Sequence, residues 1–303
     1  MASVDAPFLL PFSTSPLDRL GERRRDAAFL ASARQNPASR LLLVQDETKV
    51  PIDEHGALVW SDLGDGESTS VLVFLGVDGA GGALFSREFE EGDETPDGAA
   101  FVALREAGVG LPPFDAAAAV GAVALAAWHR RSPHCVACGG STVVEDAGHL
   151  RRCSLCGTSH FPRTDAAVIM LVTDGERCVL GRRAGAPASR WSTLAGFVEP
   201  GESLESAVAR EVLEEVGIVV HATRYRGSQP WPFPASLMVA FEADATYGPL
   251  TINDEHHDVR WFTREEVANA ISAGEMTVPG PISAGSFLIR SWLGPEHDGL
   301  WAT

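Results

Sequence analysis

The chain has 303 residues, of which 45% are hydrophobic and 21% are charged, the ordinary composition of a globular protein. This length suggests two domains or three, with enough apolar residues for real cores. The formal net charge of −17 argues against nonspecific binding of DNA or RNA, which requires Lys and Arg side chains to neutralise phosphates. A local basic pocket is still compatible with that charge.

No secretory or membrane-spanning segment is expected. Residues 1–12 lack the basic start and the sustained apolar core of a signal peptide. The longest apolar run, at 116–128, is rich in alanine and too short to span a bilayer. We therefore expect a cytoplasmic protein that contacts no membrane.

Residues 1–131 are predicted to form an N-terminal α/β domain that carries no catalytic motif. Short apolar runs bounded by polar or Gly-rich segments favour strands, and longer runs favour helices. The expected elements are strands at 41–44, 57–60 and 71–75 and helices at 99–108 and 116–131. Strands followed by helices also describe the end of the chain, so this domain could be a degenerate copy of the last one. Its expected roles are subunit contact and the shaping of a substrate cleft.

Residues 132–162 contain four cysteines in two pairs. Two residues separate the members of each pair and fourteen separate the pairs, at Cys135, Cys138, Cys153 and Cys156. Four thiolates suit tetrahedral Zn²⁺ without an open position, so the spacing predicts a structural zinc ribbon. Glycines follow each pair and let the chain turn tightly around a metal.

Two alternatives for this segment are less favoured. The cysteines could form disulfides, but thiols in the cytosol are usually reduced. Zinc ribbons also occur in nucleic-acid-binding proteins, for which Arg151 and Arg152 are the only strong basic signal here. His134, His149 and His160 lie nearby. Because four cysteines already complete a zinc shell, we expect these histidines at the surface or in packing.

Residues 163–303 are predicted to form the last domain. An apolar run at 166–172 indicates a central strand, and a turn at 174–176 makes a hairpin with the strand that follows. The later elements are expected as strands at 178–182, 218–225, 237–243 and 259–262 and helices at 264–272 and 286–292. A further helix would be capped by Ser203 and ended by Gly217. Mixed strands with a helix on each side fit an α/β/α sandwich.

Residues 196–217, a glycine-bounded loop and the helix after it, carry the strongest chemical signal. Glu211, Glu214 and Glu215 are spaced so that they share one face of that helix. Like charges in this arrangement repel unless a cation lies among them, and clustered carboxylates are ligands of Mg²⁺ or Mn²⁺. Such a metal could clamp a diphosphate and activate water. For a lone pair of glutamates, a solvated acidic face would be the better interpretation.

The same stretch resembles the Nudix box, which reads Gly, five residues, Glu, seven residues, Arg-Glu-aliphatic-x-Glu-Glu-x-Gly-aliphatic. Every position has its match, at Gly196, Glu202, Arg210, Glu211, Val212, Glu214, Glu215, Gly217 and Ile218. The resemblance implies a Nudix catalytic domain and metal-dependent hydrolysis of a diphosphate. It implies Glu211 and Glu215 as main metal ligands and Glu214 as a ligand or base. Arg210 would orient a box glutamate by ion pairing.

Further ligands are implied outside these carboxylates. The backbone carbonyl of Ala195 is one, and an extra carboxylate from a distant loop is another. Glu255 is our choice for that carboxylate, with Asp254 and Asp258 as competitors. Glu202 is expected to bind a further metal or to cap the loop.

Residues 228–236, which follow the box, alternate prolines with aromatic residues, and the segment is therefore stiff. Alone, such a segment is more often a packed loop or a peptide-docking site. At this distance from the box, after a four-Cys insert, it resembles the NADH pyrophosphatase subfamily. The substrate contacts that the resemblance implies are Gln229, Pro230, Trp231, Pro232, Phe233, Pro234, Ala235, Ser236 and Gly285. A base would stack between Phe161, commonly Tyr in the family, and Phe197. Ser286 stands where the family often has Arg, and Arg105 is a weak match for a substrate-reaching arginine.

The resemblance implies hydrolysis of the pyrophosphate of NADH or NAD⁺ to AMP and NMNH or NMN, with Mg²⁺ or Mn²⁺. It also implies removal of NAD caps from RNA 5′ ends, and a homodimer. A broader dinucleotide diphosphatase and a noncatalytic nucleotide-sensing zinc-ribbon protein are the alternatives. The intact charged positions of the box favour an enzyme over the sensor.

Overall fold

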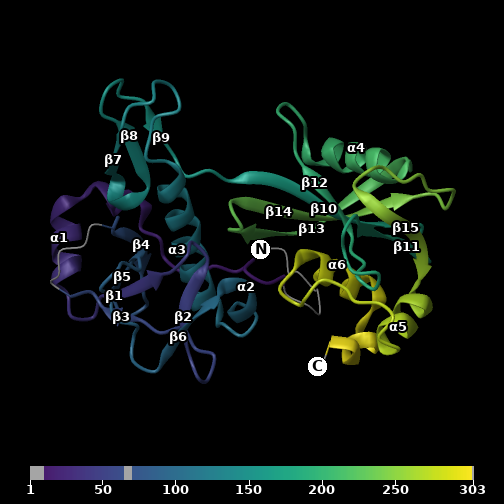
Figure 1. The fold of residues 1–303 in the computed structure, drawn as a ribbon, viewed down its shortest axis with the longest axis horizontal. Helices are drawn as coiled ribbons and strands as arrows, with labels where there is room; N and C mark the ends of the chain where they lie inside the picture. The colour runs from purple at the N-terminus through teal and green to yellow at the C-terminus, as the bar shows by residue number, and fades with distance from the viewer. Residues whose placement is uncertain (1–9, 65–69, 302–303) are drawn as a thin grey trace. The chain divides into compact units, whose positions relative to one another are not determined.

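The computed structural model describes residues 10–64 and 70–301 and divides the chain into two compact units (Figure 1). We call Thr14–Thr164 with Trp231–Ala235 the N-terminal unit. Asp165–Pro230 and Ser236–Thr303, with the described part of the first thirteen residues, form the C-terminal unit. The four-Cys segment therefore groups with the first block, and the three-part division into 1–131, 132–162 and 163–303 stays a prediction. Among the described residues, no helix is both long and apolar enough to cross a membrane.

The N-terminal unit is built on a mixed four-stranded sheet in the order β3-β1-β5-β4, with β1 parallel to β5. Its strands and helices are β1 (Arg40–Val44), β2 (Lys49–Asp53), β3 (Ser61–Asp62), β4 (Val73–Val77), β5 (Ala83–Glu88), β6 (Ala99–Ala103), η1 (Gly21–Arg25), α1 (Ala27–Gln35), α2 (Leu104–Ala107) and α3 (Pro113–Arg131). Helix α3 packs on β1, β4 and β5. Phe74 and Phe85 meet edge to face in the core. This confirms the predicted α/β region.

Two sequence expectations in this unit were wrong. Residues 99–103 form β6 rather than the start of a helix, and only 104–107 are helical. The partner of β6 is β2, which contains Pro51 and is not among the strands expected from the sequence. Pro51 is tolerated because this ribbon has only two strands, so one edge of β2 needs no continuous ladder of hydrogen bonds. The strand expected at 57–60 is reduced to an isolated bridge between Leu58 and Ile52.

The four-Cys segment is a small antiparallel sheet in the order β7-β8-β9. Its elements are β7 (Thr142–Glu145), η2 (Asp146–Gly148), β8 (Leu150–Cys153) and β9 (Ser159–His160). Gly139 and Gly157, one after each cysteine pair, both have a φ of +73°. Only glycine adopts this left-handed conformation without strain, so each knuckle can close on the same centre.

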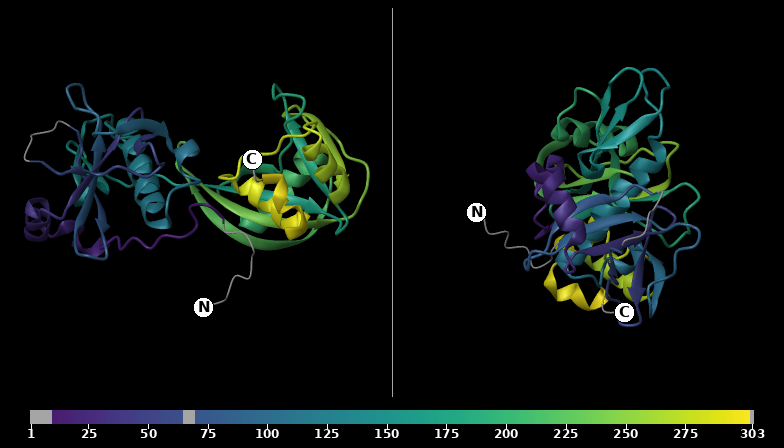
Figure 2. Two further views of the ribbon diagram at one scale, coloured as in Figure 1. Left: turned by 90° about the horizontal axis from the view of Figure 1, so that it is seen from below. Right: turned by 90° about the vertical axis from the view of Figure 1, so that its left-hand side faces the viewer.

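The C-terminal unit has three layers around a sheet in the order β13-β14-β10-β11-β15, with β12 paired to β10. The bounds are β10 (Asp165–Thr173), β11 (Arg177–Arg183), β12 (Leu194–Phe197), α4 (Leu204–Val216), β13 (Val220–Trp231), β14 (Ser236–Ala245), β15 (His256–Thr263), α5 (Arg264–Ser272), α6 (Ala284–Leu293) and η3 (Pro295–Trp301). On β10, Val168 and Met170 pack with α4, whereas Ile169 and Leu171 pack with α6. Alternation along one strand therefore supplies both faces. The α/β/α sandwich is confirmed, and Figure 2 shows the helices of the C-terminal end against the curved sheet.

The box helix is framed as the sequence predicts. The Ser203 hydroxyl accepts a hydrogen bond from the Ser206 backbone N–H, and Gly217 ends the helix with a φ of +72°. Beyond it, the two strands that flank the proline-rich turn are longer than predicted. Strand β13 continues to Trp231, and β14 starts at Ser236. Only a short turn lies between these two strands.

Candidate active site

Helix α4 carries a buried carboxylate that has no partner. Glu215 is 2% exposed, and its Oε2 atom has no hydrogen-bond partner. Burial, together with the charges of Glu211 and Glu255, raises the pKa of Glu215 to about 8. Burial also raises the pKa of Glu211, to which Glu214 and Glu255 add repulsion. An anionic carboxylate is expensive in this environment unless a cation compensates it.

Glu255, predicted from a distant loop, is brought to the helix. Its charge acts on both Glu211 and Glu215, so the loop before β15 lies beside α4. The Glu255 carbonyl accepts a 2.9 Å hydrogen bond from the Ala184 backbone N–H, which ties that loop to the end of β11. The competitor Asp258 is occupied by ion pairs with Arg260 and Arg182, at 2.5 and 4.0 Å.

The first glycine of the box leaves room for Glu211. A Cβ atom at Gly196 would lie 1.9 Å from the Glu211 carboxyl carbon. Gly196 pairs with Val168 in the register between β12 and β10, which fixes its backbone. The absence of a side chain therefore lets the Glu211 carboxylate lie against the strand, next to Ala195.

The hydrogen-bond donors of Arg210 are all used by groups of the box itself. Its Nε and Nη2 atoms donate to the two oxygens of Glu202 at 2.7 and 2.9 Å, and Nη2 also donates to the Phe197 carbonyl. Its Nη1 atom donates to Glu211 and Glu214 at 2.9 and 3.0 Å. The hydrogen bonds from Arg210 lower the pKa of Glu202 to about 2. Glu202 also accepts from the Glu199 N–H, so here it caps the loop.

A cavity of about 370 Å³ opens beside these carboxylates within the C-terminal unit. Ala195 and Glu215 line it, together with Thr193, whose buried hydroxyl has no partner, and Ser283, which caps α6. Sequence reasoning missed Thr193. A Cβ atom at Gly285 would lie 3.0 Å from the Thr193 hydroxyl, so this glycine keeps the first turn of α6 close to β12.

Gln229 has a role that the sequence did not suggest. Its side chain is fully buried, its Nε2 atom donates to the carbonyls of Pro11 and Ile282, and its Oε1 atom accepts from the Ala284 N–H. Both ends of the amide therefore brace the backbone, and the predicted ligand contact stays a prediction.

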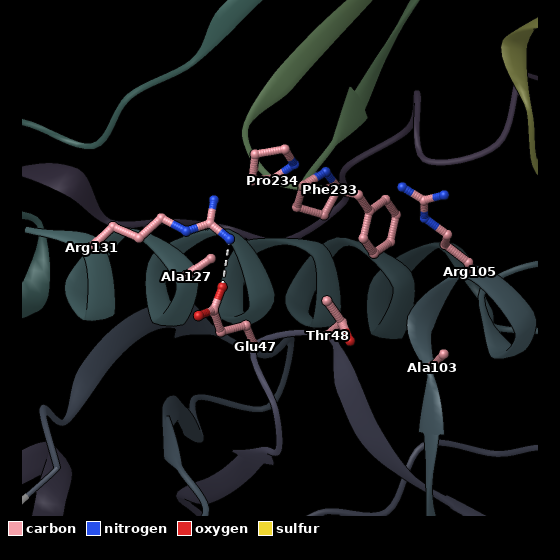
Figure 3. Close-up of a pocket in the computed structure, with 9 residues that line it drawn as sticks. Glu47, Thr48, Ala103, Arg105, Ala127, Arg131, Phe233 and Pro234 are labelled. Carbon is pink, nitrogen blue, oxygen red and sulfur yellow. Dashed lines mark hydrogen bonds and ion pairs between the residues drawn. The ribbon is translucent and has the colours of Figure 1, made fainter.

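The turn between β13 and β14 lies in the N-terminal unit. Trp231 and Phe233 meet edge to face, and the Arg105 guanidinium lies 5.1 and 4.4 Å from their ring centroids. A cavity of about 350 Å³ lies there, and Figure 3 draws the residues that line it. Its lining includes Arg105, Arg131, Glu47 and the turn residues Pro232, Phe233 and Pro234. The weakly matched Arg105 is thus a partner of the aromatic turn. Pro230, Ala235 and Ser236 flank it.

The two predicted stacking aromatics are both available. Phe161 is 67% exposed and Phe197 is 61% exposed. Each is a large apolar side chain left in solvent on its own unit, which is the condition for stacking on a flat ligand. Stacking itself stays a prediction.

The four cysteines converge. Their Sγ atoms lie within 4.8 Å of one another, and the shorter separations are 3.4 to 3.7 Å. A tetrahedron with metal–sulfur bonds of about 2.3 Å has edges of about 3.8 Å, so the set fits Zn²⁺. Hydrogen bonds from Thr158 lower the pKa of Cys156 to about 6. Among the described residues this is the only group of three or more such ligand atoms within that distance, and the box glutamates are more widely spread.

Two of the nearby histidines are not surface residues. His160 Nε2 lies 3.3 Å from Cys135 Sγ, as an N–H donor to a thiolate would. His149 is largely buried, and its Nε2 atom bonds the Phe74 carbonyl at 2.8 Å. The expectation that they pack rather than ligate is compatible with both arrangements.

Comparison with known proteins gives a consistent result. A model of the NUDIX domain matches residues 162–277. The NAD-capped RNA hydrolase NudC of Mycobacterium bovis (strain BCG / Pasteur 1173P2) is 37% identical over 298 residues, which are 92% of this chain and 95% of the relative. NudC of Mycobacterium tuberculosis (strain ATCC 25618 / H37Rv) matches to the same extent. The human NAD-capped RNA hydrolase NUDT12 is 40% identical over 181 residues, 55% of this chain and 39% of that protein.

The similarity to NudC extends over nearly the whole of both chains, and the complete box lies inside the matched NUDIX domain. Within that domain Glu215, on α4, lines a cavity. The chain therefore belongs to the Nudix hydrolase family, in the group that contains NudC.

Proposed function

We propose that this protein is a metal-dependent NAD(H) diphosphatase, which splits NADH or NAD⁺ into AMP and NMNH or NMN. The observation that carries the proposal is Glu215, a buried carboxylate without a partner, repelled by two further glutamates at the edge of a cavity. In a chain 37% identical to NudC, this arrangement supports a cation site that acts on a diphosphate.

The residues that would hold Mg²⁺ or Mn²⁺ are Glu211, Glu215, Glu255 and the Ala195 carbonyl. Bound there, the cation would neutralise phosphoryl oxygens and lower the pKa of a bound water. The raised pKa of Glu215 fits this ligand set, as does the close approach of the Glu211 carboxylate to Gly196. Either cation would suit these oxygen ligands.

The remaining box residues have separate tasks. Water attacks one phosphorus, a new P–O bond forms, the bridging P–O bond breaks and the leaving phosphate keeps the electron pair. One proton must leave the attacking water. Glu214 is half exposed and binds Arg210 through one oxygen at 3.0 Å, which leaves the other oxygen able to accept that proton. Arg210 orients Glu202 and Glu211 and does not reach outward.

We also propose that Zn²⁺ fills the four-Cys site as a structural ion. The sulfur separations and the exposed knuckle glycines support four thiolate ligands with no open position. Such a closed site supplies folding energy and no chemistry.

NAD-capped RNA is the second candidate substrate, because the relatives with high coverage are NAD-capped RNA hydrolases. The net charge of −17 limits extended contacts with RNA, so recognition would be concentrated on the cap. A broader dinucleotide diphosphatase would accept other pyrophosphates equally well. The predicted homodimer stays a prediction.

A substrate panel tests the proposal. NADH, NAD⁺, ADP-ribose, diadenosine polyphosphates and NAD-capped RNA are incubated with the purified protein and Mg²⁺ or Mn²⁺ at one salt concentration, and products are identified by mass. We expect AMP and NMNH from NADH, and 5′-monophosphate RNA from capped RNA. Equal rates on all pyrophosphates would favour the broader enzyme. Binding without any product would contradict the proposal and favour the nucleotide sensor.

A further inference from the structure

Strand β11 delivers an arginine to the cavity by simple alternation. Val179 packs in the core beneath α4, whereas Cys178 and Leu180 pack in the core beneath α6. Odd positions therefore face the carboxylate helix, and Arg183 continues that series. The pairing of β11 with β15 skips one residue of β15, His257, between Arg182 and Arg183, so the alternation along β11 continues through Arg183.

The two neighbouring arginines go to different places as a result. Arg182 lies 6.0 Å from the Trp191 ring and 4.0 Å from Asp258, outside the cavity. Arg183 lines the cavity together with Glu215.

A second arginine enters the same cavity from the loop between β11 and β12. Arg190 lines the cavity, and the residues on either side of it are pinned to one partner. The Ser189 carbonyl accepts from the Thr277 N–H at 2.7 Å, and the Trp191 N–H donates to the Thr277 carbonyl at 2.9 Å. Arg190 therefore projects from a fixed backbone.

Neither Arg183 nor Arg190 forms an ion pair with any described residue. This distinguishes them from Arg210, which spends all its donors on the box, and from Arg260, which pairs with Asp258. The cavity also contains the unpartnered Thr193 hydroxyl, which is 7% exposed. The lining of the cavity thus combines the Glu215 carboxylate with two guanidinium groups and a hydroxyl that have no partner among the described residues.

We propose that Arg183 and Arg190 form a phosphate clamp that holds the pyrophosphate of the substrate against the carboxylate face of α4. The proposal rests on the proposed function and adds the two positioning residues that neither the box nor the proline-rich turn supplies. Guanidinium groups bind phosphate oxygens by paired, charge-assisted hydrogen bonds, and both arginines have their donors available. Because Arg210 is occupied, they are the cavity's own source of positive charge.

Binding of inorganic pyrophosphate tests the clamp without turnover. Isothermal titration calorimetry in a magnesium buffer would compare the full-length protein with Arg183→Gln, Arg190→Gln and the double variant. Each single substitution should weaken pyrophosphate binding by about tenfold, since a charge-assisted hydrogen bond contributes about 1.5 kcal/mol or more. Arg183→Lys should recover part of the loss. Arg260→Gln is the matched control, because it removes an exposed arginine of the same unit that does not line the cavity.

Kinetics with NADH separate positioning from mere structure. The Gln variants should raise KM more than they lower kcat, and inhibition by adenosine, which carries no phosphate, should stay unchanged. Wild-type protein that does not bind pyrophosphate, or Gln variants that bind it within about twofold of wild type, would overturn the clamp. If the wild type binds pyrophosphate tightly but releases no AMP from NADH, the proposed function fails while the clamp stands.

Discussion

Two buried polar groups, Arg151 in the N-terminal unit and Glu215 in the C-terminal unit, are satisfied to different degrees. In the N-terminal unit Arg151 is 8% exposed and has no carboxylate partner, yet it donates to the Thr142 hydroxyl and carbonyl and to His129 Nδ1. In the C-terminal unit the buried oxygen of Glu215 has no partner at all. Satisfied polar networks stabilise a single arrangement, whereas an unsatisfied buried charge is retained where a ligand completes it. The contrast indicates a structural role for Arg151 and a ligand-binding role for Glu215.

The same contrast appears inside the box. Hydrogen bonds from Arg210 lower the pKa of Glu202 to about 2, whereas burial raises the pKa of Glu215 to about 8. The two residues belong to one motif, but only one of them is compensated by the protein. Glu202 is therefore satisfied within the loop, whereas Glu215 lacks the partner that a bound cation would supply.

The largest effect is expected from the removal of one cysteine, which should destabilise the N-terminal unit. Structural zinc sites bind with about 10–16 kcal/mol in small domains, so Cys138→Ser should lose the ion and unfold the ribbon. Zinc content by mass spectrometry, together with thermal unfolding, measures this. Cys178→Ala is the control, because Cys178 is buried in the other unit and outside the cluster. Full zinc content in Cys138→Ser would contradict a four-thiolate site.

A methyl group at Gly196 should lower the turnover of NADH without unfolding the C-terminal unit. Because a Cβ atom there would lie 1.9 Å from the Glu211 carboxyl carbon, Gly196→Ala must push that side chain away. We expect turnover of NADH to fall by about 100-fold, the scale for a displaced charged group in an active site. Gly248→Ala, whose added Cβ would meet nothing closer than 3.9 Å, is the control. Normal turnover in Gly196→Ala would show that the position of Glu211 is unimportant.

The smallest expected effect is a pH dependence of the N-terminal unit. Burial lowers the pKa of His129 from 6.5 to about 4, and its Nε2 atom bonds the Gly148 carbonyl. The unfolded chain takes up the proton near the higher value and the folded chain only near the lower one. Stability is therefore complete above the unfolded pKa and falls as the pH drops toward the folded pKa, by about 1 kcal/mol between about pH 7.5 and about pH 5.5.

Urea unfolding of wild type and His129→Gln at both pH values measures this contribution. Glutamine can replace both hydrogen bonds of the neutral imidazole but does not titrate. The variant should lose about 1 kcal/mol of the difference, and the remainder includes His149, whose pKa is also lowered to about 4 by burial. Identical pH dependence in both proteins would mean that His129 is not held neutral.

Much of this architecture could be predicted because it depends on local pattern. The cap at Ser203, the end at Gly217 and the alternation along β10 follow from residues close in sequence. Other features depend on distant partners. Gln229 is satisfied by Pro11 and Ile282, which no periodicity relates to it.

Two further features needed the structure for different reasons. Strand β2 was missed because its pairing with β6 overrides the usual effect of Pro51. The parity of Arg183 could have been read from β11, but its lack of an ion partner could not. Whether a charge is compensated is a property of the fold, and that property distinguishes the two arginines of the proposed clamp from the arginines held in ion pairs.

The central claim is that an uncompensated carboxylate at Glu215 serves a cation-dependent hydrolysis. Release of AMP from NADH with Mg²⁺ by wild type, Glu215→Gln and the exposed-face control Glu205→Gln tests it most directly. We predict release by the wild type and the control, and a loss on the order of 100- to 1,000-fold in Glu215→Gln, with a fold about as stable because Glu215 has no protein partner to lose. No AMP from the wild type, or an undiminished rate in Glu215→Gln, would contradict it.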